Sequence, residues 1–216
     1  SEQRKPDKRM TQAERTALSD KRMFEVAIEL INDRGTQKTT LKEIGESAGY
    51  SRGLANYRFG SKDGLMLELF QHFDGVWKDH LESYVGDSHG LLAVRQAASA
   101  LRDFLKKDSG YMRAMYLLWY ECLGHDSEMR NLLATHHDVY REGARRWIEE
   151  GIESGEINAS IDPAQFAIQY CAFIFGIVYQ WLVNADSIDL DAVFDSYTQT
   201  TINMLGNPDY PMEDAS

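Results

Sequence analysis

The chain has 216 residues, which is enough for one small domain and one larger domain with a substantial core. A hydrophobic content of 43% and an aromatic content of 11% exclude a disordered chain and are typical of a globular protein. The net charge of −11 is unevenly spread, because residues 1–70 carry 13 Lys and Arg against 11 Asp and Glu, whereas the remainder carries 10 against 23. A negatively charged partner would therefore bind the amino-terminal third of the chain.

A basic arm is expected at residues 1–15, where Arg4, Lys5, Lys8 and Arg9 precede the first periodic apolar segment. Such an arm can lie along a nucleic-acid backbone or in a minor groove. It can equally be a mobile, solubilising tail. The sequence favours a tail that gains some order on DNA.

Two short helices joined by a tight turn are predicted at about 41–48 and 52–58, after a first helix at about 16–34. Thr40 followed by Glu43 is a capping-box pattern, and Ser51 is a good cap for the second short helix. Gly49 stands where the first must end in a left-handed conformation. This layout is that of a helix-turn-helix, whose second helix enters the DNA major groove. The pattern also fits an αα-hairpin in an all-helical core.

Side chains suited to DNA contact gather on the second short helix. Arg52 and Tyr57 can donate to bases or phosphates, and the small Gly53 and Ala55 permit a close approach of the backbone. The start of the next helix is a natural phosphate site, with Lys62 beside its free N–H groups. The expected DNA-binding residues are Lys42, Ser51, Arg52, Gly53, Asn56, Tyr57, Arg58 and Lys62.

A known family shares this block in order and spacing, through Arg22–Gly35, Thr39–Gly49, Ser51–Gly53, Tyr57–Phe59 and Ser61–Leu65. Residues 16–70 thus resemble the DNA-binding domain of the tetracycline-repressor (TetR) family of transcriptional regulators. The chain departs from the family at three positions. Where the family usually has a bulky apolar residue, an aromatic residue and often His, this chain has Ala55, Asn56 and Arg58. The general role carries over, but no operator sequence does.

The rest of the chain also reads as helices, since no segment alternates as a strand does. They are predicted at about 62–84, 90–107, 111–123, 128–154, 163–184 and 189–205. The expected fold is therefore all-α with about nine helices: a helix-turn-helix DNA-binding domain at 16–62, a ligand-binding and dimerisation domain at 63–206, and a disordered tail at 207–216.

The predicted helix from Pro163 is apolar on two faces and so needs two partners. One large core could cover both faces. The resemblance instead implies a homodimer that pairs its last two helices in a four-helix bundle, which would double the base contacts on a palindrome. The expected dimer interface comprises Phe166, Phe175, Gly176, Tyr179, Val193, Tyr197 and Leu205.

The middle helices are rich in aromatic and Met side chains, which in most proteins are simply core. The resemblance implies a pocket there for a small hydrophobic or amphipathic effector. The expected lining is Phe73, Trp77, Phe104, Met115, Trp119, Tyr120, Tyr140, Tyr170 and Phe173. Polar groups for the ligand would come from His80, His136, His137, Arg113 and Arg141. An inward-facing Arg113 or Arg141 would favour an acidic ligand.

The expected function is a ligand-responsive transcriptional regulator, and repression is the commoner behaviour in the family that the chain resembles. The regulator would leave double-stranded operator DNA when an effector tilts the long linking helix. No cofactor, metal or enzymatic activity is expected, because the chain has no phosphate loop and no hydrolase or metalloprotease motif. Cys122 and His125 have a weak zinc-like spacing, which leaves a metal-binding protein or enzyme as one alternative. A helical adaptor that binds protein through its acidic surface is another.

The expected location is the cytoplasm. The amino-terminal residues are polar and lack the apolar core of a signal peptide. The densest apolar run, Tyr170 to Val183, is interrupted by Gln180 and is expected to be too short for a membrane span. Cys122 and Cys171 lie in apolar segments and are expected to be buried, reduced thiols.

Overall fold

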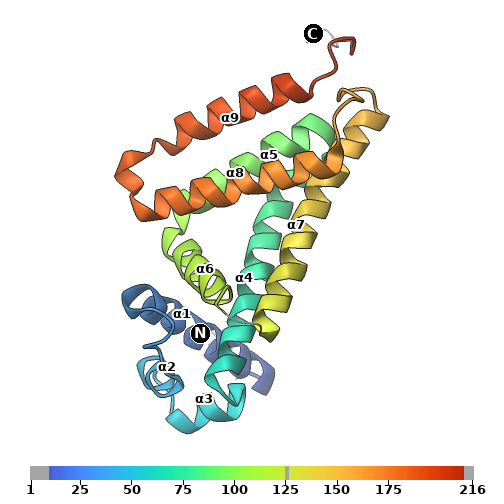
Figure 1. Ribbon diagram of the computed structural model, residues 1–216. Helices are drawn as coiled ribbons and strands as arrows, with labels where there is room; N and C mark the ends of the chain where they lie inside the picture. The colour runs from blue at the N-terminus through green and yellow to red at the C-terminus, as the bar shows by residue number, and fades with distance from the viewer. Residues whose placement is uncertain (1–9, 125–126, 212–216) are drawn as a thin grey trace, which may run out of the picture. The chain divides into compact units, whose positions relative to one another are not determined.

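The computed structural model describes residues 10–124 and 127–211 (Figure 1). These residues form nine α-helices and one short 3₁₀ helix, which confirms the predicted all-α fold. The chain divides into two compact units, the first ending at Phe70 and the second beginning at Gln71. The division falls about two turns into the fourth helix, whereas the predicted boundary at residue 62 lies where that helix begins.

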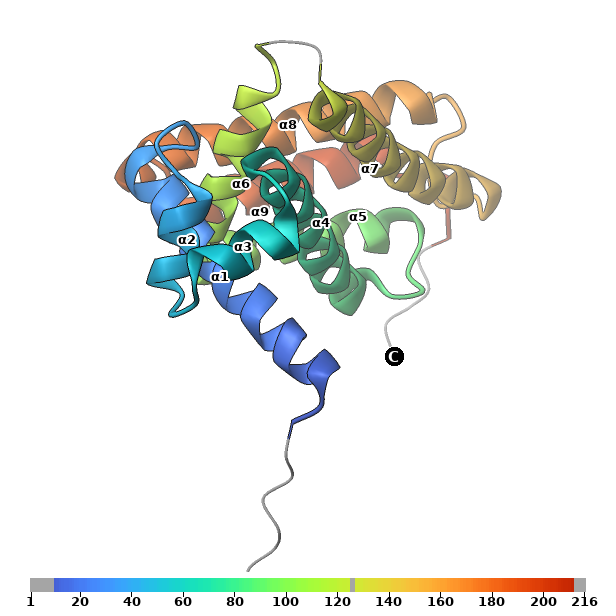
Figure 2. The same ribbon diagram turned by 90° about the horizontal axis from the view of Figure 1, so that it is seen from below.

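The first unit holds α1 (Gln12–Arg34), α2 (Leu41–Ser47), α3 (Arg52–Phe59) and the start of α4 (Lys62–Val85) (Figure 2). α1 begins four residues before the predicted start. The hydroxyl of Thr11 accepts the N–H of Glu14 at 3.2 Å, and the Glu14 carboxylate accepts the N–H of Thr11 at 2.6 Å. This capping box was visible in the sequence as Thr-x-x-Glu. Of the predicted basic arm, residues 1–9 lie outside the described part.

The turn between α2 and α3 forms as the sequence predicts. The hydroxyl of Thr40 caps α2 and that of Ser51 caps α3 by accepting the N–H of Leu54 at 3.2 Å. Gly49 has a φ of +85°, the left-handed conformation that glycine adopts without steric cost. The turn therefore fixes the direction in which α3 leaves α2.

Small residues set the close packing of α2 on α3. A Cβ atom added to Gly45 would lie 3.2 Å from the Cβ of Ala55, which is fully buried. Ala55 therefore faces α2, and the expectation that it helps the backbone of α3 approach a DNA groove is corrected.

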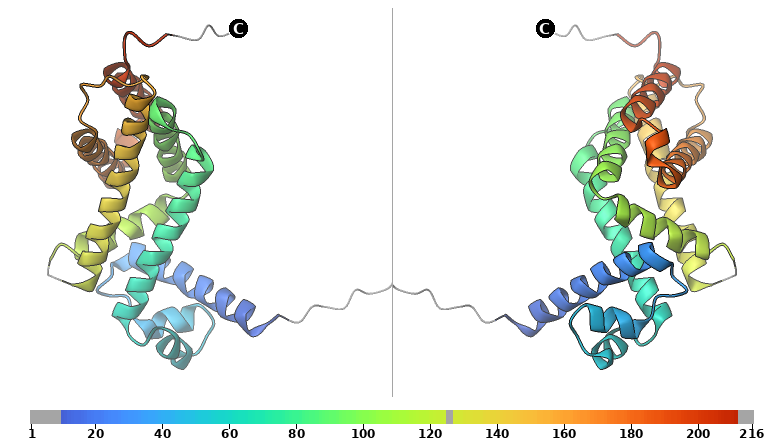
Figure 3. Two further views of the ribbon diagram at one scale, coloured as in Figure 1. Left: turned by 90° about the vertical axis from the view of Figure 1, so that its right-hand side faces the viewer. Right: turned by 90° about the vertical axis from the view of Figure 1, so that its left-hand side faces the viewer.

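The second unit holds the rest of α4 with five further helices, and its core lies where α5, α7 and α8 meet (Figures 1 and 3). α6 begins two residues earlier than predicted, and the short helix η1 was not predicted. The bounds are α5 (Gly90–Lys107), α6 (Ser109–Glu121), α7 (Glu128–Glu153), α8 (Pro163–Val183), η1 (Ala185–Ser187) and α9 (Leu190–Leu205).

The start of the predicted disordered tail is fixed against the α7–α8 connection. The N–H of Asn207 donates to the carbonyl of Glu156 at 2.8 Å, and that of Asn158 donates to the carbonyl of Leu205 at 2.8 Å. The tail prediction for residues 212–216 lies outside the described residues.

Helix α8 corrects the expectation about membrane-spanning length. It has 21 residues and a mean hydropathy of 1.6 over its most apolar window, enough to cross a membrane by length and composition alone. The apolar run from Tyr170 to Val183 is only part of the helix, which starts at Pro163. Core helices of soluble proteins have the same properties, and 39% of this window is buried inside the fold.

Candidate DNA-binding surface and central cavity

The exposed surface of α3 carries four of the eight residues expected to contact DNA. Arg52, Gly53, Asn56 and Tyr57 are exposed, and Tyr57 reaches 89%. Lys42 of α2 and Ser51 at the start of α3 are exposed as well. A fully exposed tyrosine on a short helix has no packing role in its own fold, so this surface is available for a partner.

Arg58 is directed inward, which corrects its expected place among the DNA contacts. Its Nε lies 2.9 Å from Asp20 Oδ1, and its Nη1 and Nη2 lie 2.9 Å and 2.7 Å from the two carboxylate oxygens of Glu68. Its guanidinium carbon also lies 4.9 Å from the centre of the Phe59 ring. Hydrogen bonds to Glu68 and Asp20 raise the pKa of Arg58. Arg58 thus joins α1, α3 and α4 within the first unit.

The start of α4 keeps a basic residue where the phosphate site was expected. Lys62 is half-buried, and its Nζ donates to the carbonyl of Gln37 at 3.3 Å. The hydroxyl of Ser61 accepts the N–H of Gly64 at 3.0 Å, which uses one of the free N–H groups.

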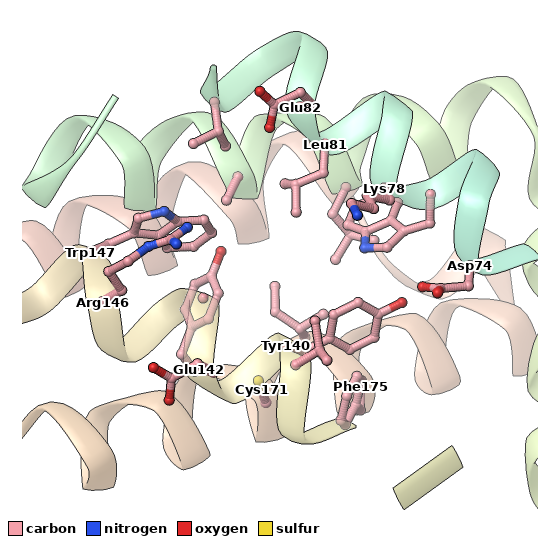
Figure 4. A pocket seen from close by; sticks show the side chains of 18 of the residues that line it. Asp74, Lys78, Leu81, Glu82, Tyr140, Glu142, Arg146, Trp147, Cys171 and Phe175 are labelled. Atoms are coloured by element: carbon pink, nitrogen blue, oxygen red, sulfur yellow. The ribbon is translucent and has the colours of Figure 1, made fainter. Parts of the chain in front are cut away.

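A cavity of about 1030 Å³ lies in the second unit between α4 and α7, with α5, α6 and α8 completing its walls (Figure 4). Its inner wall is aromatic and apolar. Five residues of the expected ligand set line it: Trp77, Met115, Trp119, Tyr140 and Tyr170. The wall also includes residues outside the expected ligand set: Leu81, Met112, Tyr116, Trp147, Cys171, Ile174 and Phe175.

Four residues expected at the ligand pocket do not line the cavity. Phe73 and Phe104 pack within the core, edge-on to Tyr111 with ring centres 4.6 Å and 5.9 Å apart. Phe173 stacks on Tyr197 of α9 at 3.5 Å. Tyr120 is 47% exposed and meets Tyr179 at the surface. An aromatic stripe thus identified the right helices, but not which face of each helix borders the cavity.

Charged side chains line the cavity along α4 and α7. Residues four apart lie on one side of a helix, so each helix presents a single charged stripe. Together with Asp87, the lining has six acidic and two basic side chains. The stripes are Asp74, Lys78 and Glu82 on α4 and Asp138, Glu142, Arg146 and Glu150 on α7, and Figure 4 labels most of them.

The polar residues expected to hold the ligand are engaged elsewhere. Arg113 donates to the carbonyl of Leu182 at 2.7 Å, Arg141 pairs with Asp138, and a ring nitrogen of His80 lies 2.7 Å from the carbonyl oxygen of Ala100. Neither these three nor His136 and His137 line the cavity. An acidic ligand therefore finds no arginine from this set.

Asp74, which lines the cavity from α4, contacts His136 of α7. Asp74 Oδ1 lies 2.9 Å from Nδ1 of His136, which is buried. Burial lowers the pKa of His136, although the Asp74 charge opposes this. His136 is therefore mainly neutral at pH 7, because its ordinary pKa already lies below 7 and burial lowers it further.

Metal chemistry gains no support from the described residues, among which no group of three or more His, Cys, Asp or Glu side chains is placed to hold an ion. Cys122 donates its thiol to the carbonyl of Leu118, and burial raises its pKa. The other member of the zinc-like pair, His125, lies outside the described residues.

Two family models match the chain. The model for bacterial regulatory proteins of the tetR family matches residues 24–69, and that for the C-terminal region of MAATS-type transcriptional repressors matches residues 97–207, about half of the chain. The chain belongs to the TetR family of transcriptional regulators. Members of this family bind DNA through a helix-turn-helix and are typically repressors, and homodimers and effector binding are general features of the family.

Individual TetR-family relatives resemble the chain over most of its length. The regulator TtgR of Pseudomonas putida is 24% identical over 85% of this chain and 89% of its own, and BetI of Rhizobium meliloti is 25% identical over 88% and 93%. The structure of Bacillus subtilis FadR in complex with stearoyl-CoA superposes with a TM-score of 0.74 at 20% identity, over 85% of this chain and 98% of that one. That likeness shows a shared fold.

One side of α8 is exposed and apolar. Ile168, Ala172, Gly176, Tyr179 and Val183 follow one another at helical spacing. A Cβ atom on Gly176 would meet no atom within 4 Å.

Three residues expected at the dimer interface belong elsewhere. Phe166 and Leu205 are buried in the core of their own chain, and Phe175 lines the cavity. Tyr179 is exposed, and Val193 and Tyr197 are half-buried.

Proposed function

We propose that this protein is a homodimeric transcriptional repressor that binds a palindromic operator through α3 and is released by a large amphipathic effector in the α4–α7 cavity. The observation that carries this proposal is the cavity of about 1030 Å³ with an aromatic wall, which has the size and lining of a pocket for one bulky organic molecule. A relative of the same fold holds stearoyl-CoA, itself a large amphipathic molecule.

The proposed DNA contacts are the exposed residues of the helix-turn-helix. Arg52, Asn56 and Tyr57 would contact base edges or nearby phosphates, while Lys42 and Lys62 would contact the backbone. One recognition helix offers few base contacts, so a two-fold dimer on two half-sites is needed for specificity.

The proposed dimer surface is the exposed apolar side of α8 together with Val193 and Tyr197 of α9. Gly176 would allow the partner helix to approach closely, since its front is open. This arrangement also explains why α8 is apolar on a side that its own core leaves exposed.

The proposed release follows from α4, which begins in the first unit at Lys62 and lines the cavity from Asp74 to Val85. An effector that binds more tightly to the conformation with α4 displaced would favour that conformation. The two recognition helices would then no longer fit major grooves that lie ~34–36 Å apart, or a multiple of that distance.

Selection of bound duplexes from a random DNA library tests the proposal. The purified full chain should enrich a palindrome, and a gel shift with that palindrome should be lost in Arg52→Ala/Tyr57→Ala. Both side chains are exposed, so the double variant should melt like the wild type. If no palindrome is enriched, or the double variant binds as well as the wild type, the proposal fails and a helical adaptor becomes the better interpretation.

A further inference from the structure

Some of the acidic side chains around the cavity have no basic side chain paired with them, among the described residues, to neutralise their charge. On α7, Asp138 and Glu142 pair with Arg141 and Arg145 on the outer side of the helix. Glu82 and Asp87 have no ion pair within the described part of the chain. A charged ligand entering between α4 and α7 therefore meets a net negative potential.

Asp74 concentrates this charge at one end of the cavity. Its only ion-pair partner in the described chain is the buried His136, whose Nδ1 lies 2.9 Å from Oδ1 and whose mainly neutral ring does not cancel the carboxylate charge. The Asp74 side chain remains 45% exposed, and Figure 4 shows it beside Tyr140. Asp74 is thus a carboxylate with capacity for one more partner, beside an aromatic ring.

The remaining wall suits a cation with a large apolar body. Aromatic faces attract cations because their π-electron density is negative, and the attraction is strongest for Trp and for ligands shed of water. Three of the four Trp of the chain line the cavity, with three Tyr and one Phe: Trp77, Trp119, Trp147, Tyr116, Tyr140, Tyr170 and Phe175.

We propose that the effector is a bulky lipophilic cation, with its charged group against Asp74 and its apolar body along the aromatic wall. The inference rests on the proposed function, because it names the ligand class of the same cavity. It also separates this protein from its relative with stearoyl-CoA, since the phosphates of such a ligand would face Asp74, Glu82 and Asp87, none of which pairs with Lys or Arg within the described residues.

A ligand bound at Asp74 would also affect the contact between α4 and α7. A cation on this carboxylate competes with His136 for Asp74, so the contact between α4 and α7 weakens as the ligand binds. The bound charge is thereby coupled to the position of α4.

Two ions of the same shape and opposite charge test the proposal: tetraphenylphosphonium and tetraphenylborate. Binding to the DNA-free full chain is followed by quenching of Trp fluorescence and by calorimetry. We expect the phosphonium to bind at least about tenfold more tightly, a difference of about 1.4 kcal/mol. Asp74→Asn, which keeps the size of the side chain, should remove most of that preference. Asp79→Asn, on an exposed α4 position outside the cavity, should not change it.

Equal or tighter binding of the borate would overturn the proposal, as would absence of phosphonium binding. A preference for the phosphonium that is unchanged in Asp74→Asn would do the same. These readouts need no operator, so a protein that binds its palindrome but prefers the borate refutes the ligand class and leaves the repressor proposal standing.

Discussion

Arg58 of α3 and Glu68 of α4 form a two-point ion pair, with Nη1–Oε1 and Nη2–Oε2 distances of 2.9 Å and 2.7 Å. The same guanidinium holds Asp20 of α1. A two-point contact resists rotation as well as separation. The candidate recognition helix is therefore fixed to the first two turns of α4, so a displacement of that segment would carry α3 with it.

Arg58→Lys should destabilise the first unit, because an ammonium group cannot satisfy two carboxylates in the planar geometry of a guanidinium. We expect a loss of about 1–3 kcal/mol, the range for hydrogen bonds to charged groups. Urea unfolding followed by circular dichroism measures it. Arg52→Lys, on the exposed face of α3, is the matched control and should unfold like the wild type. Equal stability of the two variants would mean that the contact contributes nothing.

The local structure of this fold could be predicted from the sequence, whereas contacts between residues far apart in the sequence could not. The caps at Thr40 and Ser51 and the left-handed turn at Gly49 are set by neighbouring residues, so the helix-turn-helix was predictable. The inward turn of Arg58 was not, because Asp20 is 38 residues away in the sequence. Nothing in the spacing of the recognition helix distinguishes a basic residue for phosphate from one that holds a carboxylate inside the fold.

The same limit explains the errors in the cavity and dimer sets. α8 is apolar on most of its circumference, so periodicity cannot tell whether Phe166, Phe173 and Phe175 meet the core, α9 or a cavity. Only the packing of α7 on α8 and the contact of α9 side chains with Phe173 assign them, and both depend on contacts between distant segments. Periodicity places Trp147 on the inner face of α7, but it does not indicate that this face borders a cavity.

Filling the cavity should block the effector without disturbing the fold. Gly143 of α7 lines the cavity, and a Cβ atom there would meet no atom within 4 Å. Gly143→Leu is therefore expected to lower tetraphenylphosphonium affinity about tenfold or more while operator affinity is retained. Gly75→Leu is the matched control, because Gly75 is a helical α4 glycine with equally open surroundings outside the cavity. Unchanged effector binding in Gly143→Leu would place the ligand somewhere else.

Gly176→Glu should separate the proposed dimer into monomers. The side chain finds open space in its own chain, but it would bring a charge into each copy of a close helix contact. Sedimentation at micromolar concentration should show the monomer mass, and operator affinity should fall by about tenfold or more, because each half-site would be bound alone. Ala134→Glu on the exposed surface of α7 should remain a dimer. A dimeric Gly176→Glu would remove this side of α8 from the proposed interface.

His137 makes the second unit sensitive to mild acid. Its ring is half-buried between Trp119 and Phe175, and its Nε2 is buried without a hydrogen-bond partner in the described chain. Burial, helped by His136 and Arg141, lowers the pKa of His137 to about 4. A lowered folded pKa means that the unfolded chain takes up the proton first. Stability is therefore complete above the ordinary value near 6.5 and is lost as the pH falls towards 4.

The histidine contribution can be isolated because carboxylates with lowered pKa values, such as Glu142, titrate below this window. Between pH 7 and pH 5 the wild type should lose about 1–2 kcal/mol through His137. His137→Phe keeps the aromatic packing and removes the titration, so its urea midpoint should fall less over the same interval. The exposed His89→Gln should behave as the wild type does. If His137→Phe loses as much stability as the wild type, the acid sensitivity arises at another group, and the buried His136 beside Asp74 is the next to replace.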